Sequence, residues 1–145
     1  MSNIEDFLTA KEEEEIVEAI RVAECDTSGE IRVHIERICE SDAYERALDL
    51  FHILKMDNTN EQNGVLLYVA VDNKSFVIIG DHGINNIVGA DFWNSTRDKI
   101  ATQFMSGNFK QGIIDGIMEA GKKLSQYFPW HHNDRDELHN TISKG

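Results

Sequence analysis

Apolar side chains recur every three or four residues in four segments of the chain, and this period predicts four helices. The first begins at Thr9, where Thr9 and Glu12 match the S/T-x-x-E capping box, and it continues to about Cys25. The second is expected to be capped by Ser41. The second, third and fourth helices are expected over residues 41–56, 92–106 and 109–128.

Three further segments have the patterns of strands. Residues 30–38 alternate between apolar and polar side chains, which predicts a strand with one exposed face near an edge of the sheet, with His34 in solvent. Residues 64–71 are continuously apolar, which indicates a strand covered on both faces. A tight turn over 72–74 leads into a strand over 76–80, so these two strands should form an antiparallel hairpin.

The order helix, strand, helix, strand, strand, helix, helix determines the fold class. A strand–helix–strand unit normally makes a right-handed parallel crossover, so the hairpin makes the sheet mixed. We therefore predict an α/β fold, a Rossmann-like three-layer α/β/α sandwich around a small mixed sheet. The 145 residues fit one domain, expected over 1–128, with a polar C-terminal tail over 129–145.

Charge and hydropathy exclude several classes of function. The net charge of −12, from 14 basic and 26 acidic side chains, repels phosphate backbones, so we expect no nucleic-acid binding. No segment has the roughly 18 consecutive apolar residues of a membrane span, and the N-terminus lacks a signal-peptide pattern. We therefore expect a cytoplasmic protein without membrane insertion. The chain also contains no P-loop, G-x-G-x-x-G or G-x-S-x-G motif.

Three polar segments are expected to meet at one end of the sheet, which we call the rim. If the strands at 30–38 and 64–71 are parallel, both begin there, and the hairpin returns the strand at 76–80 to the same end. The segments are residues 28–30, 57–63 and 80–91. Oxygen ligands without cysteine suit Ca²⁺ or Mg²⁺. The metal-ligand candidates are Glu30, Asp57, Asp81 and Asp91, and Glu61 could also reach the rim.

Each candidate also has a purely structural interpretation. Asp81 is the preferred ligand, because glycines flank the Asp81-His82 pair and a buried strand precedes it, whereas His82 is more typical of a turn residue. Asp91 could equally cap the helix expected from residue 92. Asp57 matches a solvated loop residue. No arginine is expected near the rim, which disfavours a phosphate clamp.

Several stretches resemble the TPM-domain family, over about residues 7–128. They are TSGEIRVHIE (27–36), NGVLLYVAVDNKSFVIIGDHGI (63–84) and FMSGNFKQGIIDGI (104–117). That family includes thylakoid-lumen and membrane-anchored bacterial proteins and shorter stand-alone bacterial ones. This chain resembles a stand-alone cytoplasmic bacterial member. The resemblance implies an α/β/α fold and a divalent-cation site at one end of the sheet. For some members it implies weak acid-phosphatase activity, and for others action through a partner.

Three functional hypotheses follow. The leading one is a module that binds Ca²⁺ or Mg²⁺ and acts through a protein partner. The second is a weak metal-assisted acid phosphatase, in which the ion activates a water and His82 serves as acid or base. The third is a structural interaction domain without a ligand. Whether the chain is an enzyme stays open at this point.

Overall fold

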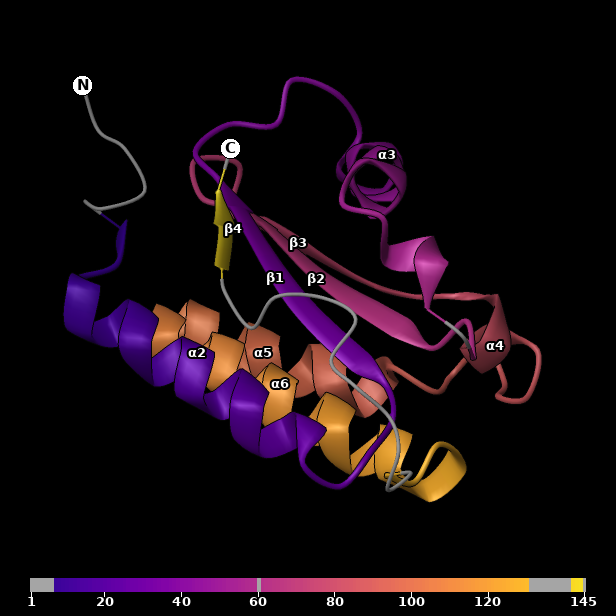
Figure 1. Cartoon of the computed structure of the whole chain (residues 1–145). Helices are drawn as coiled ribbons and strands as arrows, with labels where there is room; N and C mark the ends of the chain where they lie inside the picture. Colours follow the sequence, from indigo (N-terminus) through magenta and orange to yellow (C-terminus); the bar gives the residue numbers. More distant parts are fainter. Residues whose placement is uncertain (1–6, 60, 131–141, 145) are drawn as a thin grey trace.

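The computed structural model describes residues 7–59, 61–130 and 142–144. In chain order its elements are α2 (Ala10–Glu24), β1 (Glu30–Glu36), α3 (Ala43–Ile53), the 3₁₀ turn η1 (Met56–Asn58), β2 (Gly64–Ala70), β3 (Ser75–Gly80), α4 (His82–Asn85), α5 (Asn94–Met105), α6 (Phe109–Tyr127) and β4 (Ile142–Lys144). Figure 1 shows α3 on one face of the sheet and α2, α5 and α6 on the other. The predicted three-layer α/β/α fold is confirmed. None of the described helices is long and apolar enough to cross a membrane.

The sheet is mixed, with the strand order β3-β2-β1-β4. β1 and β2 are parallel, with Glu30 opposite Gly64, and β2 and β3 form the predicted antiparallel hairpin, with Val65 opposite Gly80. β4 pairs in parallel with the other side of β1. It lies within the segment expected as a polar tail, so residues 142–144 add a strand that the sequence pattern did not predict. Residues 131–141 and 145 of that segment lie outside the described part.

The prediction that one face of β1 is exposed is wrong, although the strand does lie near an edge of the sheet. β1 lies between β2 and β4, and both of its faces are covered. His34, expected in solvent, is 3% exposed. The alternation arises because the polar face of β1 forms contacts inside the protein: Glu36 accepts hydrogen bonds from Arg46 of α3 and from Tyr68 of β2. A buried polar row and a solvated one have the same period in the sequence.

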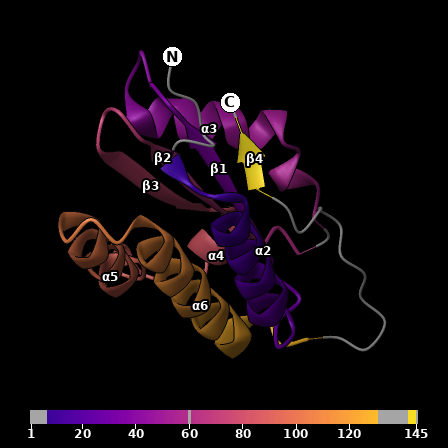
Figure 2. The ribbon, with the colours of Figure 1, turned by 90° about the vertical axis from the view of Figure 1, so that its left-hand side faces the viewer.

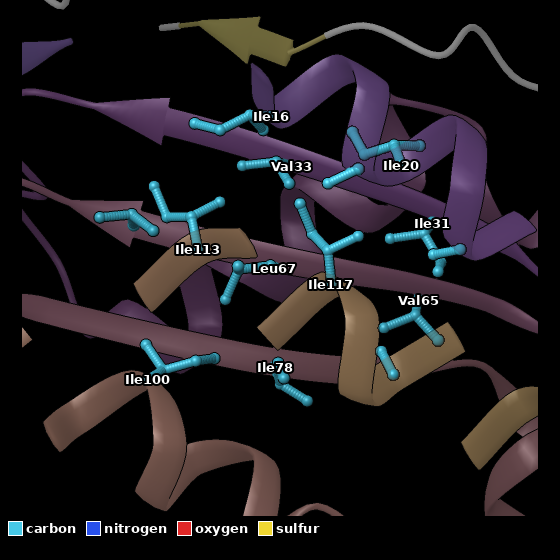
Figure 3. Close-up of a cluster of buried hydrophobic side chains, with 14 of the residues drawn as sticks. Ile16, Ile20, Ile31, Val33, Val65, Leu67, Ile78, Ile100, Ile113 and Ile117 are labelled. Atoms are coloured by element: carbon cyan, nitrogen blue, oxygen red, sulfur yellow. The ribbon is translucent and has the colours of Figure 1, made fainter. Parts of the chain in front are cut away.

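Two apolar clusters hold the layers together. The larger one joins the sheet to α2, α5 and α6, and Figure 3 shows Ile113 and Ile117 of α6 directed at the strands. The smaller one joins the other face of the sheet to α3, through residues such as Phe51, Leu66 and Ile79. Burying one such aliphatic or aromatic side chain contributes about 1.5–3 kcal/mol, so these contacts, more than helix propensity, hold the helices on the sheet.

The observed helices differ from the predicted ones in three places: the cap of α3, the start of α5 and the presence of α4. Asp42, rather than Ser41, caps α3, because its carboxylate accepts a hydrogen bond from the backbone N–H of Glu45 at 3.1 Å. α5 begins at Asn94, two residues later than expected. The short helix α4 was not predicted, since its four residues are too few to show a helical period.

Replacing Thr9 with alanine is expected to lower the free energy of unfolding by about 1 kcal/mol. Thr9 Oγ1 accepts from the N–H of Glu12 at 3.1 Å, and the Glu12 carboxylate accepts from the N–H of Thr9 at 3.0 Å, which confirms the capping box. Urea unfolding measures the change. Thr102→Ala is the control, because Thr102 is exposed within α5 and alanine favours helix there. An equal loss in both variants would contradict a specific capping role.

Candidate functional site

The three polar segments predicted to meet at the rim do meet, where β1 and β2 begin and β3 ends. The hydroxyl of Ser28 donates to the carboxylate of Glu61 at 2.8 Å. The side-chain amide of Asn63 donates to Ser28 Oγ at 3.2 Å. The N–H of Gly83, after β3, donates to the carbonyl of Gln62 at 2.8 Å. The convergence inferred from the element order is therefore confirmed.

Glu30 and Asp81 lie on opposite sides of Gly64 in one row across the sheet. Glu30 is opposite Gly64 in the parallel β1–β2 register. The N–H of Asp81 donates to the Gly64 carbonyl at 3.0 Å, which continues the β2–β3 ladder by one residue. Two strand spacings separate the backbones of the two acidic residues, about 9–10 Å. Gly64 between them has no side chain, and the carbonyl and the side-chain methyl of Met56 fill the space where its Cβ would lie.

The carboxylate of Asp81 is only half satisfied by hydrogen bonds. Its Oδ1 accepts from the N–H of His82 at 2.7 Å, which caps α4. Its Oδ2 is buried and has no hydrogen-bond partner among the described residues, and the whole residue is only 6% exposed. A buried, unsatisfied polar group destabilises the folded state by about 1–3 kcal/mol, and by more when it is charged. A cation at this oxygen would remove that penalty.

A neutral oxygen lies on the same side of Gly64. The carbonyl oxygen of Met56, in η1, is 2.9 Å from the position that a Cβ on Gly64 would take. Glu30 itself is buried, with 4% of its surface exposed. Two carboxylates and a carbonyl are the kinds of oxygen that hard divalent cations accept in proteins.

Asp57 and Asp91 have structural partners of their own. Asp57 is paired with His52 at 2.8 Å, and the hydrogen bond from His52 lowers the pKa of Asp57. Asp91 is exposed and accepts from the side chain of Asn94 at 3.3 Å. It is not the cap of α5 either, since the capping position is Trp93, which makes no side-chain cap bond.

The four predicted ligands therefore do not form one set. The described part of the chain contains no group of three or more His, Cys, Asp or Glu side chains placed to hold a metal ion. Glu30 and Asp81 share the rim around Gly64, while His82 is exposed at the start of α4.

The expectation that no arginine lies near the rim is wrong. Arg32 follows Glu30 by two residues on the same face of β1, roughly 6.6 Å further along the strand. Its Nε is buried and has no hydrogen-bond partner among the described residues, and burial lowers the pKa of its guanidinium. The alternating pattern of residues 30–38 puts Arg32 on the face that was expected to be exposed to solvent.

A second titratable cluster lies further along the same face of β1, and the sequence did not reveal it. Glu36 contacts His34 at 3.4 Å and is hydrogen-bonded to Arg46 and Tyr68. Burial opposes ionisation of Glu36, but the hydrogen bonds from Arg46 and Tyr68 outweigh it and lower its pKa to about 2. Burial lowers the pKa of His34 and raises that of Tyr68. A pattern in the sequence could have indicated this cluster: charged side chains alternate along β1, and the neighbouring apolar strand β2 has a tyrosine near its centre.

Comparison with known proteins agrees with this fold. The model of the TPM domain family matches residues 2–123, so the chain belongs to the TPM-domain family. The solution structure of the protein BA42 from the psychrophilic bacterium Bizionia argentinensis is 63% identical, covers 100% of both chains and superposes with a TM-score of 0.92. The N-terminal domain of a protein from P. gingivalis is 21% identical and shares the fold, with a TM-score of 0.68 over 88% of this chain and 83% of its own. No protein with a curated description matches the chain.

Proposed function

We propose that this TPM domain binds a divalent cation, Ca²⁺ or Mg²⁺, at the rim through the carboxylates of Glu30 and Asp81. The observation that carries the proposal is the buried Oδ2 of Asp81, which has no hydrogen-bond partner among the described residues and lies across Gly64 from a second buried carboxylate. Two buried carboxylates near one another repel, and a cation between them relieves this repulsion.

The ligand set supports either ion. Mg²⁺ commonly takes one or two carboxylates and completes its shell with water, which matches a pair such as Glu30 and Asp81. Ca²⁺ accepts six to eight oxygens and readily includes backbone carbonyls, and the carbonyl oxygen of Met56 lies beside Gly64. The cation would also fix the positions of β1, β2 and β3 relative to one another at this end of the sheet. It would thereby order the loop surface that a protein partner meets.

The test is calorimetric and thermal titration of the protein with CaCl₂ and with MgCl₂. A ligand that binds only the native state should raise the free energy of unfolding by about 2.7 kcal/mol at 100 times its Kd. Asp81→Asn should abolish the binding heat and this stabilisation. Asparagine is a good helix cap, so the variant should keep α4 while it loses the charge.

Asp57→Asn and Asp91→Asn are matched controls, because they remove the same charge from carboxylates that already pair with His52 and Asn94. Both are expected to bind the cation like the parent protein. Stability indifferent to both ions would contradict the proposal and favour a ligand-free structural domain. Loss of binding in Asp57→Asn but not in Asp81→Asn would contradict the assignment of the site.

Metal-assisted phosphate hydrolysis is the second candidate, and Arg32 is the observation that favours it. A guanidinium without a carboxylate partner among the described residues, two positions from Glu30, could pair with a phosphoryl oxygen while the cation polarises another. Hydrolysis of p-nitrophenyl phosphate, with and without EDTA, tests this. Turnover that needs Mg²⁺ and falls at least ~10-fold in Arg32→Gln would support it. Cation binding without turnover would contradict the phosphatase hypothesis and support cation binding as the function.

A further inference from the structure

β3 is an outermost strand of the sheet, and its free side is chemically unprotected. Among the described residues it pairs only with β2. Figure 2 shows it at the border of the sheet, with α3 on one face and α5 on the other. Natural edge strands usually carry a charge, a proline or a bulge that prevents pairing with another chain. The sequence of β3, SFVIIG, contains no charged residue and no proline.

The backbone groups of Ile78 and Gly80 face this free side. In an antiparallel ladder the hydrogen-bonding direction alternates, and the bond from the N–H of Asp81 to Gly64 determines the phase. The Gly80 carbonyl accepts from the side-chain amide of Asn85 at 3.0 Å. No hydrogen bond within the described ranges satisfies the outward groups of Ile78. One donor and one acceptor are therefore available at this point for another strand.

A groove of about 390 Å³ adjoins this edge. The residues that line it include Tyr44 of α3, Ile78 and Gly80 of β3, and Val88 and Trp93 from the segment between α4 and α5. These side chains are mostly apolar. The groove thus combines a strand edge with flanking side chains, as peptide-binding domains that add a strand to their sheet do.

Arg97 is the one charged residue that lines the groove. Its guanidinium donates to the side chain of Asn94 at 3.1 Å and forms no ion pair with any described acidic residue. The chain has 26 acidic and 14 basic residues, so acidic residues that could pair with an arginine are abundant in the chain itself. The positive charge of Arg97, which has no ion-pair partner among the described residues, therefore favours an anionic group on the occupant of the groove.

We propose that this groove is a docking site for an extended segment of a partner protein, which pairs with β3 and places a carboxylate against Arg97. Main-chain hydrogen bonds to Ile78 would supply affinity, and the arginine would supply specificity through a charge-assisted hydrogen bond. A second copy of this chain fits less well. Its own β3 contains no acidic residue, so symmetric pairing of the two strands would leave both copies of Arg97 without a counter-charge.

The test uses the isotope-labelled full chain and a set of heptapeptides with blocked termini. The peptides alternate threonine and valine and carry one glutamate, moved through the seven positions, and each has a matched peptide with glutamine instead. We expect at least one glutamate peptide to shift the NMR signals of residues 78–80 and of the Trp93 indole, and to slow amide exchange at Ile78. It should bind at least ~10-fold more tightly than its glutamine partner.

Two variants separate the charge from the groove. Arg97→Gln should bring the glutamate and glutamine peptides to within about 2-fold of each other, and Tyr44→Ala should weaken both peptides alike. Arg21→Gln, which removes an exposed arginine on α2, is the control and should leave the discrimination unchanged. The measurements are made in EDTA, which removes divalent cations. Their outcome therefore tests the docking site separately from the proposed cation site.

Any of four outcomes would overturn the docking proposal. The first is that no peptide binds at millimolar concentration. The second is binding that shifts signals only away from β3. The third is a glutamate preference that survives Arg97→Gln. The fourth is a concentration-dependent dimer whose interface signals fall on β3, because a second copy would then occupy the edge.

Discussion

Replacing Glu36 with glutamine should lower the free energy of unfolding at pH 7 by about 3 kcal/mol, because it breaks a buried charge pair and leaves Arg46 without its counter-ion. The pKa of Glu36 is about 2 in the folded protein, against an ordinary value of 4.5. A difference of this size corresponds to about 3 kcal/mol of stabilisation by the ionised form. Urea unfolding at pH 7 measures the loss.

The effect of Glu36→Gln has a defined pH dependence. A carboxyl group whose pKa is lowered on folding stabilises the protein fully above its unfolded pKa of about 4.5, and this contribution disappears as the pH falls through about 2. The difference between parent and variant should therefore shrink from pH 4.5 downward. His34, whose pKa is lowered by burial, adds a loss of stability below about pH 6.5 in both proteins. This loss should be larger in the variant, because Glu36 contacts His34 and opposes the lowering of its pKa.

Glu18→Gln is the control for Glu36. Glu18 pairs with Arg21 on the surface of α2, where both side chains are more than half exposed. Exposed pairs of this kind contribute little to stability, so this variant should remain close to the parent protein. A difference between parent and Glu36→Gln that stayed constant down to pH 2 would show that packing, and not the charge, is what the substitution removes.

Gly83→Ala is expected to destabilise the protein by about 3 kcal/mol, at the upper end of the range for overpacking. A Cβ at this position would overlap the carbonyl oxygen of Glu61 and lie 2.5 Å from that of Gln62. Both obstacles are backbone atoms, so they cannot move away as a side chain could. Either α4 or the loop before β2 must shift, and the hydrogen bond from the N–H of Gly83 to Gln62 would be lost.

Gly89→Ala is the matched control for Gly83→Ala. No atom lies within 4 Å of a Cβ built on Gly89, and its φ is not in the left-handed region. That substitution should be neutral, or should stabilise the protein by up to about 1 kcal/mol because alanine lowers the conformational entropy of the unfolded chain. Thermal unfolding of the two variants distinguishes a local steric effect from a general cost of losing glycine. Equal destabilisation would refute the close approach of the 80–83 and 61–62 segments.

The sequence predicted the layers and the rim because these depend on the order and polarity of whole elements. The continuous apolar run at 64–71 is typical of a strand buried on both faces, and the short turn after it determines the direction of the next strand. Once those two directions are known, the meeting of residues 28–30, 61–63 and 80–83 follows without knowledge of any side chain.

Individual side chains could not be placed in this way. Asp57 pairs with His52, which lies five residues earlier, and the residues around Asp57 in the sequence do not reveal that pairing. The partners of Glu36 lie 10 and 32 residues away, so its alternating strand looked solvated. β4 has only three residues, too few for a period to be detected. Arg32 lies on the polar face of β1, and a buried polar face has the same alternating pattern in the sequence as a solvated one.

The pairing of β4 with β1 has a consequence for the time course of folding. Val33 and Ile142 are neighbours in the sheet but lie about 110 residues apart in sequence, and contacts of such long range form slowly. β1 therefore has one neighbour from the moment β2 is synthesised, and gains the other only after α6 and the following segment have left the ribosome. In the interval the second edge of β1 is open to pairing with other chains, which makes nascent protein more prone to aggregate than the finished fold.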